Sequence, residues 1–135
     1  MIEIYTDGAY SPTRNQGGWA FVVLKNGVKV SSGFDSVLDT TNNRMEIQAV
    51  IEAIKHMNNQ QISDFTIYSD SMYVIGTMTQ NWKKKKNVDL WIELEDVILP
   101  TSKITWKHVK GHNGDKWNDH CDMLAVHGSQ INIKN

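Results

Sequence analysis

The sequence has one cysteine, two prolines and a net charge of only −1 in 135 residues. The single cysteine, Cys121, excludes an internal disulfide and a cysteine metal cluster, and we expect it to be a small buried residue. The apolar runs fall far short of the roughly 20 residues that a membrane span needs, and the start, Met1-Ile-Glu-Ile, does not resemble a signal peptide. We therefore expect a cytoplasmic protein that does not bind membranes.

The remaining composition is that of a globular protein, with 40% hydrophobic and 21% charged residues. At this length the chain fits one domain, which we expect over residues 1–128, with a frayed tail over 129–135. Residues 1–82 carry eight acids and five bases, whereas residues 83–116 carry five acids and eight bases. An acidic and a basic pole can therefore coexist on one surface. A monomer is the default expectation, and the sequence does not decide whether the protein accompanies a polymerase or another replication partner.

Apolar periodicity predicts an α/β fold with the element order βββαβααβα. Asn26-Gly27 indicates a tight hairpin, because both turn positions need positive φ. An opening antiparallel meander followed by strands that alternate with helices predicts a five-stranded mixed sheet with helices on both faces. The expected strands cover residues 2–7, 17–24, 28–34, 65–70 and 103–109, and the expected helices cover 43–57, a segment from 71, 88–99 and 116–128.

Two acids follow predicted strands directly. Asp7 and Asp70 stand at the carboxyl ends of their strands, where open sheets with parallel strands place their ligands. A charged group at the end of a buried strand is costly unless a partner compensates it. The alternative for each residue alone is a turn or helix-cap aspartate.

Two further acids lie near the inward faces of predicted helices. Glu46 lies in the first turn of its helix beside the apolar stripe, although Asn43-x-x-Glu46 also has the spacing of a capping box. Asp122 lies at the margin of the core stripe of the last helix, where a solvated acid is the alternative. Carboxylates that converge repel one another unless cations bind there, and a set of oxygen ligands suits Mg²⁺ or Mn²⁺ better than Zn²⁺.

Five motifs stand out along the chain: "YTDGAY" (5–10), "TTNNRMEIQA" (40–49), "SDSMYV" (69–74), "NVDLW" (87–91) and "VKGHNGDKWNDHCDMLA" (109–125). In order and spacing they resemble type 1 ribonuclease H over nearly the whole chain, up to about residue 128. The resemblance implies that Asp7, Glu46, Asp70 and Asp122 hold two Mg²⁺ ions, for which Mn²⁺ can substitute. It also implies hydrolysis of the RNA strand of an RNA/DNA hybrid, which leaves 5′-phosphate and 3′-hydroxyl ends.

The same resemblance assigns further residues to the substrate and to proton transfer. His112 matches a loop histidine that assists proton transfer or product departure, with plain solvent exposure as the alternative. Asn42 and Asn43 match residues that contact the minor groove of the hybrid, and Thr41 matches part of a pocket for a DNA phosphate. Helix capping is the alternative for these three residues.

The sequence also departs from the family pattern. A longer helix and a basic protrusion of many members are reduced to "NWKKKK", residues 81–86. Trp82 and Lys83, Lys84, Lys85 and Lys86 are candidates to hold the DNA backbone, with a solvated turn as the alternative, and we expect weaker binding than in longer relatives. Met72 replaces a common glutamine, and Leu24 replaces a basic residue that often helps the phosphate pocket.

Two other classes of protein remain as alternatives. One is a catalytically silent module that binds hybrids with or without metal. The other is a nuclease or integrase of the same architecture that acts on DNA, against which the pair Asn42 and Asn43 argues.

Overall fold

The described residues of the computed structural model, 1–111 and 114–133, contain five strands and four helices in the predicted order. The elements are β1 (Ile2–Ser11), β2 (Gln16–Lys25), β3 (Val28–Leu38), α1 (Asn42–Asn59), β4 (Asp64–Ser69), α2 (Met72–Thr79), α3 (Val88–Val97), β5 (Lys103–His108) and α4 (Lys116–Gln130).

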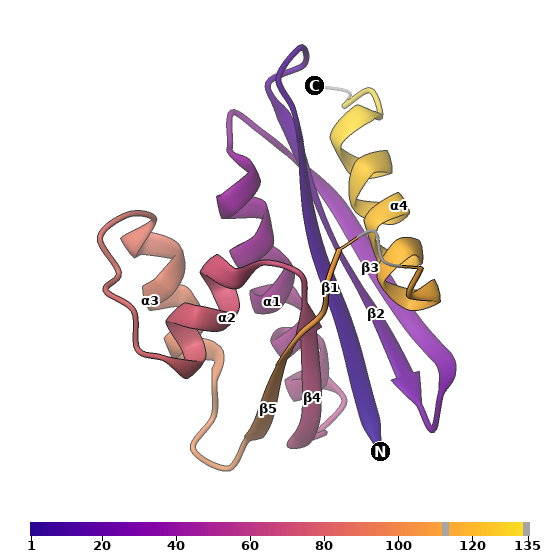
Figure 1. Cartoon of the computed structure of the whole chain (residues 1–135), viewed down its shortest axis with the longest axis vertical. Helices are drawn as coiled ribbons and strands as arrows, with labels where there is room; N and C mark the ends of the chain where they lie inside the picture. Colours follow the sequence, from indigo (N-terminus) through magenta and orange to yellow (C-terminus); the bar gives the residue numbers. More distant parts are fainter. Residues whose placement is uncertain (112–113, 134–135) are drawn as a thin grey trace.

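The five strands form one mixed sheet, as predicted, and their order within it is β3-β2-β1-β4-β5. β1, β2 and β3 pair antiparallel, while β1, β4 and β5 run parallel to one another. Helices α1, α2 and α3 lie on one side of the sheet and α4 on the other (Figure 1). The carboxyl ends of the three parallel strands therefore meet at one edge of a sheet that is flanked by helices.

β1 is four residues longer than predicted, and this extension shapes the site. Its pairing with β2 continues to Ser11 opposite Gln16, whereas its pairing with β4 ends at Thr6 opposite Ser69. Beyond Thr6, β1 is paired on one side only, which leaves the other side open at the end of β4. The segment "GAYS" escaped prediction because it lacks the alternation of apolar and polar residues that marks a half-buried strand.

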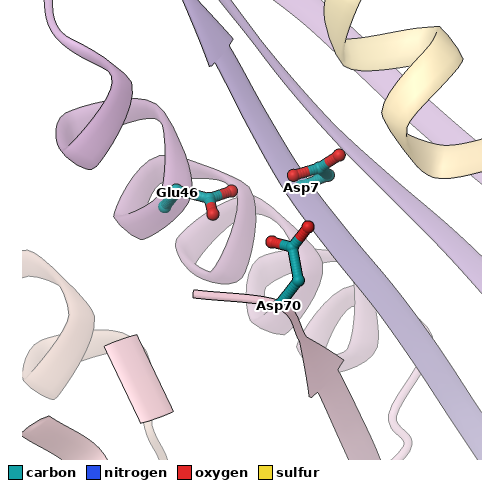
Figure 2. Close-up of side chains that lie close together, drawn as sticks. All are labelled: Asp7, Glu46 and Asp70. Atoms are coloured by element: carbon teal, nitrogen blue, oxygen red, sulfur yellow. The ribbon is translucent and has the colours of Figure 1, made fainter. Parts of the chain in front are cut away.

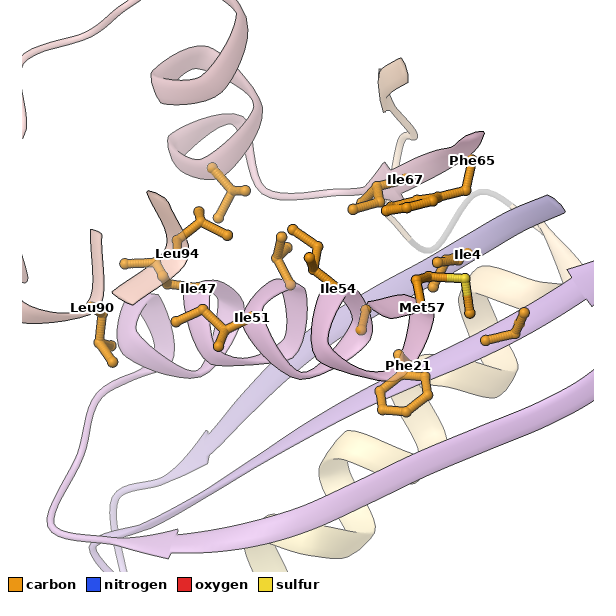
Figure 3. Close-up of a cluster of buried hydrophobic side chains, with 14 of the residues drawn as sticks. Ile4, Phe21, Ile47, Ile51, Ile54, Met57, Phe65, Ile67, Leu90 and Leu94 are labelled. Atoms are coloured by element: carbon orange, nitrogen blue, oxygen red, sulfur yellow. The ribbon is translucent and has the colours of Figure 1, made fainter. Parts of the chain in front are cut away.

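Two apolar clusters, one on each face of the sheet, hold the helices in place. The larger one joins α1 and α3 to β1, β2 and β4, and includes Ile4, Ile51 and Phe65 (Figure 3). Trp91, which is 1% exposed, belongs to the same cluster. The smaller one lies under α4 and includes Cys121, whose sulfur lies near the carbonyl oxygens of Tyr5 and Ala20. Trp19, Trp106 and Trp117 are partly buried against these clusters.

Glycines in the strands let both major helices approach the sheet closely. A Cβ atom at Gly8 would lie 2.4 Å from the backbone nitrogen of Glu46, so only glycine permits this contact between β1 and α1. A Cβ atom at Gly18 would lie 2.1 Å from the carbonyl oxygen of Ala125 in α4. The first contact involves Glu46 itself, and the second involves Ala125, one helical turn after Asp122.

α4 continues two residues beyond the predicted end. The side chain of Gln16 donates to the carbonyl oxygens of Gly128 and Ile131 at 2.9 and 2.7 Å, and Ser129 is buried. The expected start of the tail at residue 129 therefore falls inside the helix. Within the described part of the chain, none of the helices has the length and apolar character of a membrane span.

Candidate active site

Asp7 and Asp70 are brought together by the register of two parallel strands. Thr6 and Ser69 form the last pair between β1 and β4, so each acid is the next residue along its strand. β4 then gives way to α2, which begins after Ser71 as its N-cap. Asp70 thus lies at the point where the sheet opens beside β1.

Glu46 reaches the same place from α1. The N-cap of α1 is Thr41, whose hydroxyl accepts a hydrogen bond from the backbone N–H of Arg44 at 3.2 Å. The capping-box alternative for Asn43 and Glu46 is therefore wrong, because the helix starts earlier. Glu46 instead accepts a hydrogen bond from the backbone N–H of Gly8, which also donates to Asp7 Oδ1 at 2.9 Å.

Three of the four predicted carboxylates form a compact group. One oxygen from each of Asp7, Glu46 and Asp70 lies within 4.8 Å of the other two, and their side chains point toward a common centre (Figure 2). Asp122, from α4 on the other side of the sheet, is close enough for its charge to raise the pKa of Asp7. The structure therefore brings three of the four predicted acids into one group, and Asp122 lies outside this group but near Asp7.

Burial makes negative charge unfavourable at this site. Asp7 and Glu46 are only 3% and 5% exposed. Burial, together with the charge of Asp70, raises the pKa of Asp7 to about 8. Burial and the charge of Asp7 also raise the pKa of Glu46 well above its usual value. In the absence of a cation, Asp7 and Glu46 therefore retain protons near neutral pH.

The carboxylate group fits a hard divalent cation. Asp7 Oδ2 is buried and has no hydrogen-bond partner among the described residues. The ion pairs of the described residues do not involve Asp7, Glu46 or Asp70. They join Arg44 to Asp89, Lys55 to Glu52 and Glu93, and Lys84 to Glu95. Closely spaced carboxylate oxygens, one of them without a partner, are the ligands that Mg²⁺ and Mn²⁺ prefer.

The predicted loop histidine, His112, lies outside the described residues. The chain leading to it passes beside the acids, since a Cβ atom at Gly111 would lie 2.8 Å from Asp70 Oδ2. His108, at the end of β5, has its Nε2 atom 3.2 Å from the carbonyl oxygen of Asp70. The sequence assigned no role to His108, and this contact fixes the backbone at Asp70.

The residues predicted to contact substrate lie in two separate places. Thr41, Asn42 and Asn43 are exposed at the start of α1, one turn before Glu46. Met72, in the first turn of α2, is 41% exposed. Leu24 is 3% exposed and lies in the core under α4, near the end of β2. Thr40, which precedes Thr41, instead approaches Gly17 near the start of β2. Leu24 therefore does not border Thr41 and cannot affect a phosphate pocket there.

The second group of predicted substrate residues lies in the segment between α2 and α3. The Trp82 ring lies against Gly76 of α2 and is 42% exposed, and its Nε1 donates to Gln80 at 3.1 Å. Lys84 forms an ion pair of 2.9 Å with Glu95 of α3. Lys83, Lys85 and Lys86 are exposed.

Sequence reasoning missed the contact that joins these two places. Arg44 binds both carboxylate oxygens of Asp89, at 3.0 and 2.7 Å, and also approaches Asn87 Oδ1 at 3.3 Å. Arg44 and Asp89 are separated by 45 residues, so neither helical periodicity nor local spacing indicates the pair.

The chain is similar to known proteins in both sequence and fold. Residues 1–130 match the family RNase H. A ribonuclease H from Albidiferax ferrireducens is 39% identical, over 98% of this chain and 97% of the relative, and one from Verminephrobacter eiseniae is 42% identical, over 95% and 90%. In fold, the chain is similar to ribonuclease H1 of Halobacterium salinarum (TM-score 0.79, 23% identity, covering 94% and 96% of the two chains). It is also similar in fold to LC11-RNase H1, solved with an RNA/DNA hybrid (TM-score 0.81, 18% identity, covering 94% and 95%). The chain therefore belongs to the ribonuclease H family.

Proposed function

We propose that the chain is an endonuclease that hydrolyses the RNA strand of RNA/DNA hybrids with two Mg²⁺ ions. The observation that carries this proposal is the buried group of Asp7, Glu46 and Asp70, with Asp122 beside it and Asp7 Oδ2 without a partner among the described residues. Four carboxylates formally balance two dications. If these acids served only the fold, we would expect a lysine or arginine beside them, because buried like charges destabilise a protein.

The proposed ions are held by Asp7, Glu46, Asp70 and Asp122, and Mn²⁺ can replace Mg²⁺ at oxygen ligands. When bound, they supply activation of the attacking water and stabilisation of the leaving oxygen, in keeping with 5′-phosphate and 3′-hydroxyl products.

The chain itself orients the carboxylates. The backbone N–H of Gly8 holds one oxygen of Asp7 and one of Glu46, which leaves the second oxygen of Asp7 free to bind a cation. His108 contacts the backbone of the third acid, through the carbonyl oxygen of Asp70. We assign to His112, the residue after Gly111 in the sequence, the transfer of a proton or the release of product.

The choice of a hybrid as substrate rests on the exposed residues at the start of α1. Asn42 and Asn43 carry amide donors and acceptors that can distinguish a strand with 2′-hydroxyl groups from one without them. We place a DNA phosphate at Thr41, and the DNA backbone along Trp82 and Lys83, Lys84, Lys85 and Lys86. The hybrid bound to LC11-RNase H1, a structural relative, supports this substrate class.

A comparison of four substrates tests the proposal. We expect the chain with Mg²⁺ to cut the RNA strand of a hybrid and to leave duplex DNA, duplex RNA and single-stranded RNA intact. An Asn42→Ala, Asn43→Ala variant should cut the hybrid less efficiently while its carboxylates remain intact. Cleavage of duplex DNA at a comparable rate would instead support the nuclease or integrase alternative.

A further inference from the structure

The hydroxyl group of Tyr73 lies at the centre of a small hydrogen-bond network. It accepts hydrogen bonds from Trp91 Nε1 and Asn87 Nδ2, both at 3.2 Å, and it donates to the carbonyl oxygen of Lys86 at 3.4 Å. The Tyr73 ring also packs edge to face against Trp91, with the ring centroids 5.4 Å apart. One hydroxyl group of α2 thus fixes both the last lysine of the lysine segment (residues 82–86) and the start of α3.

Asn87 extends this network to α1. It is the N-cap of α3, yet its side chain makes no capping hydrogen bond, and its backbone adopts the left-handed conformation at φ 57°. The side chain instead bridges Tyr73 and Arg44, through Nδ2 at 3.2 Å and Oδ1 at 3.3 Å. An asparagine at an N-cap ordinarily accepts a hydrogen bond from the backbone of its own helix. The Asn87 side chain makes long-range contacts instead.

Arg44 completes the connection at the start of α1. It follows Asn43 directly, and its guanidinium binds Asp89 with two parallel hydrogen bonds. Such a two-pronged pair fixes direction as well as distance. The chain of contacts Asp89–Arg44–Asn87–Tyr73–Lys86 therefore joins the residues that precede Glu46 to the lysine segment.

We propose that Arg44 and Tyr73 are positioning residues that fix the distance between the two substrate-binding surfaces, Asn42 and Asn43 on one side and the lysine segment on the other. The inference rests on the proposed function, because it assumes that both surfaces contact one hybrid. Neither positioning residue contacts the reacting atoms. Their effect is to hold both surfaces in the geometry of the bound state, so that less conformational freedom is lost when the hybrid binds.

The test is a Tyr73→Phe variant, which keeps the ring packed against Trp91 but removes the hydroxyl group. We expect KM for the hybrid to rise about fivefold to tenfold, since several hydrogen bonds are lost, while kcat stays within about twofold because the carboxylates are untouched. The matched control is Tyr10→Phe, which removes an exposed hydroxyl group bonded to Asn15 at 2.7 Å. The control should leave both constants unchanged.

A double-mutant cycle separates positioning from a general loss of structure. In a background with Lys83, Lys85 and Lys86 all replaced by glutamine, Tyr73→Phe should have little further effect on KM, because its role is exerted through those lysines. An equal effect in both backgrounds, or a fall in kcat with KM unchanged, would overturn the inference. Arg44→Gln is the second variant, and it should behave in the same way if Tyr73→Phe proves too unstable to study.

Binding measurements without metal keep this inference distinct from the proposed function. Titration of a labelled hybrid in the presence of chelator gives Kd without cleavage. If the wild type binds hybrids but never cuts them, the proposed function fails, and Tyr73→Phe should still raise Kd. If the wild type cuts hybrids and Tyr73→Phe changes neither Kd nor KM, only the positioning role fails.

Discussion

At the scale of single residues, Asp7 combines a buried position with a carboxylate oxygen that lacks a partner among the described residues. Its pKa is raised to about 8 by burial and by the charge of Asp70, against 3.8 for an ordinary aspartate. Between about pH 4 and 8, the folded metal-free protein therefore binds more protons than the unfolded chain. The free energy of unfolding must then fall as pH rises through this window.

We predict that, in chelator, the wild type is less stable at pH 8 than at about pH 5.5, and that Asp7→Asn reduces this difference. An amide cannot ionise, so the variant does not bear the cost of a buried charge at residue 7, and Glu46, whose pKa burial also raises, accounts for the difference that remains. Urea unfolding at the two pH values measures the effect. Mg²⁺ at pH 8 should stabilise the wild type more than the variant, because only the wild type keeps the full ligand set.

Asp64→Asn is the control for this measurement, since Asp64 is an exposed acid at the opposite end of β4 from Asp70. It should leave the pH dependence of the wild type unchanged. A metal-free wild type that is as stable at pH 8 as at about pH 5.5 would contradict the assignment of a raised pKa to Asp7.

At the scale of elements, the lysine segment between α2 and α3 contains lysines in different states. Lys84 is paired with Glu95 of α3, whereas Lys85 is exposed. We predict that Lys85→Gln lowers the salt dependence of hybrid binding by about one phosphate contact and that Lys84→Gln lowers it less. Kd measured at several salt concentrations gives the two slopes. Equal slopes for the two variants would mean that the ion pair does not withhold Lys84 from the hybrid.

The contact between β1 and α1 gives a second prediction at this scale. A Cβ atom at Gly8 would meet the backbone at Glu46, so Gly8→Ala must push α1 away from the sheet. We expect a loss of about 2–3 kcal/mol of stability and a marked fall in cleavage, because Glu46 is displaced. Ser11→Ala, in the same strand, should change neither property. A Gly8→Ala variant with wild-type stability and activity would show that α1 can shift without disturbing the site.

At the scale of the whole molecule, the sequence predicts the order and type of every described element. The hairpin at Asn26-Gly27 and the apolar stripe of α1 could be predicted because both depend on local sequence patterns. The convergence of Asp7 and Asp70 also followed from their places at the ends of strands. Element ends were less predictable: β1 runs to Ser11 because of pairing with β2, which leaves no periodic signal in β1 itself.

Contacts between distant segments were beyond sequence reasoning. The pattern Asn43-x-x-Glu46 satisfies a capping box, and only the close approach of Gly8 in β1 reveals that Glu46 has another partner. The bridge from Arg44 to Asn87 and Asp89 likewise depends on how α3 lies against α1. Residue types predicted the chemistry of the site, whereas tertiary packing determines the partners of each side chain.

The most direct test of the central claim is cleavage of an RNA/DNA hybrid with each strand labelled, by the wild type and by Asp70→Asn, with Mg²⁺ or with chelator. The account predicts metal-dependent cutting of the RNA strand alone, with 5′-phosphate ends, and its loss in the variant. Tight hybrid binding without cutting, in Mg²⁺ and in Mn²⁺, would contradict the account and favour a catalytically silent binding module.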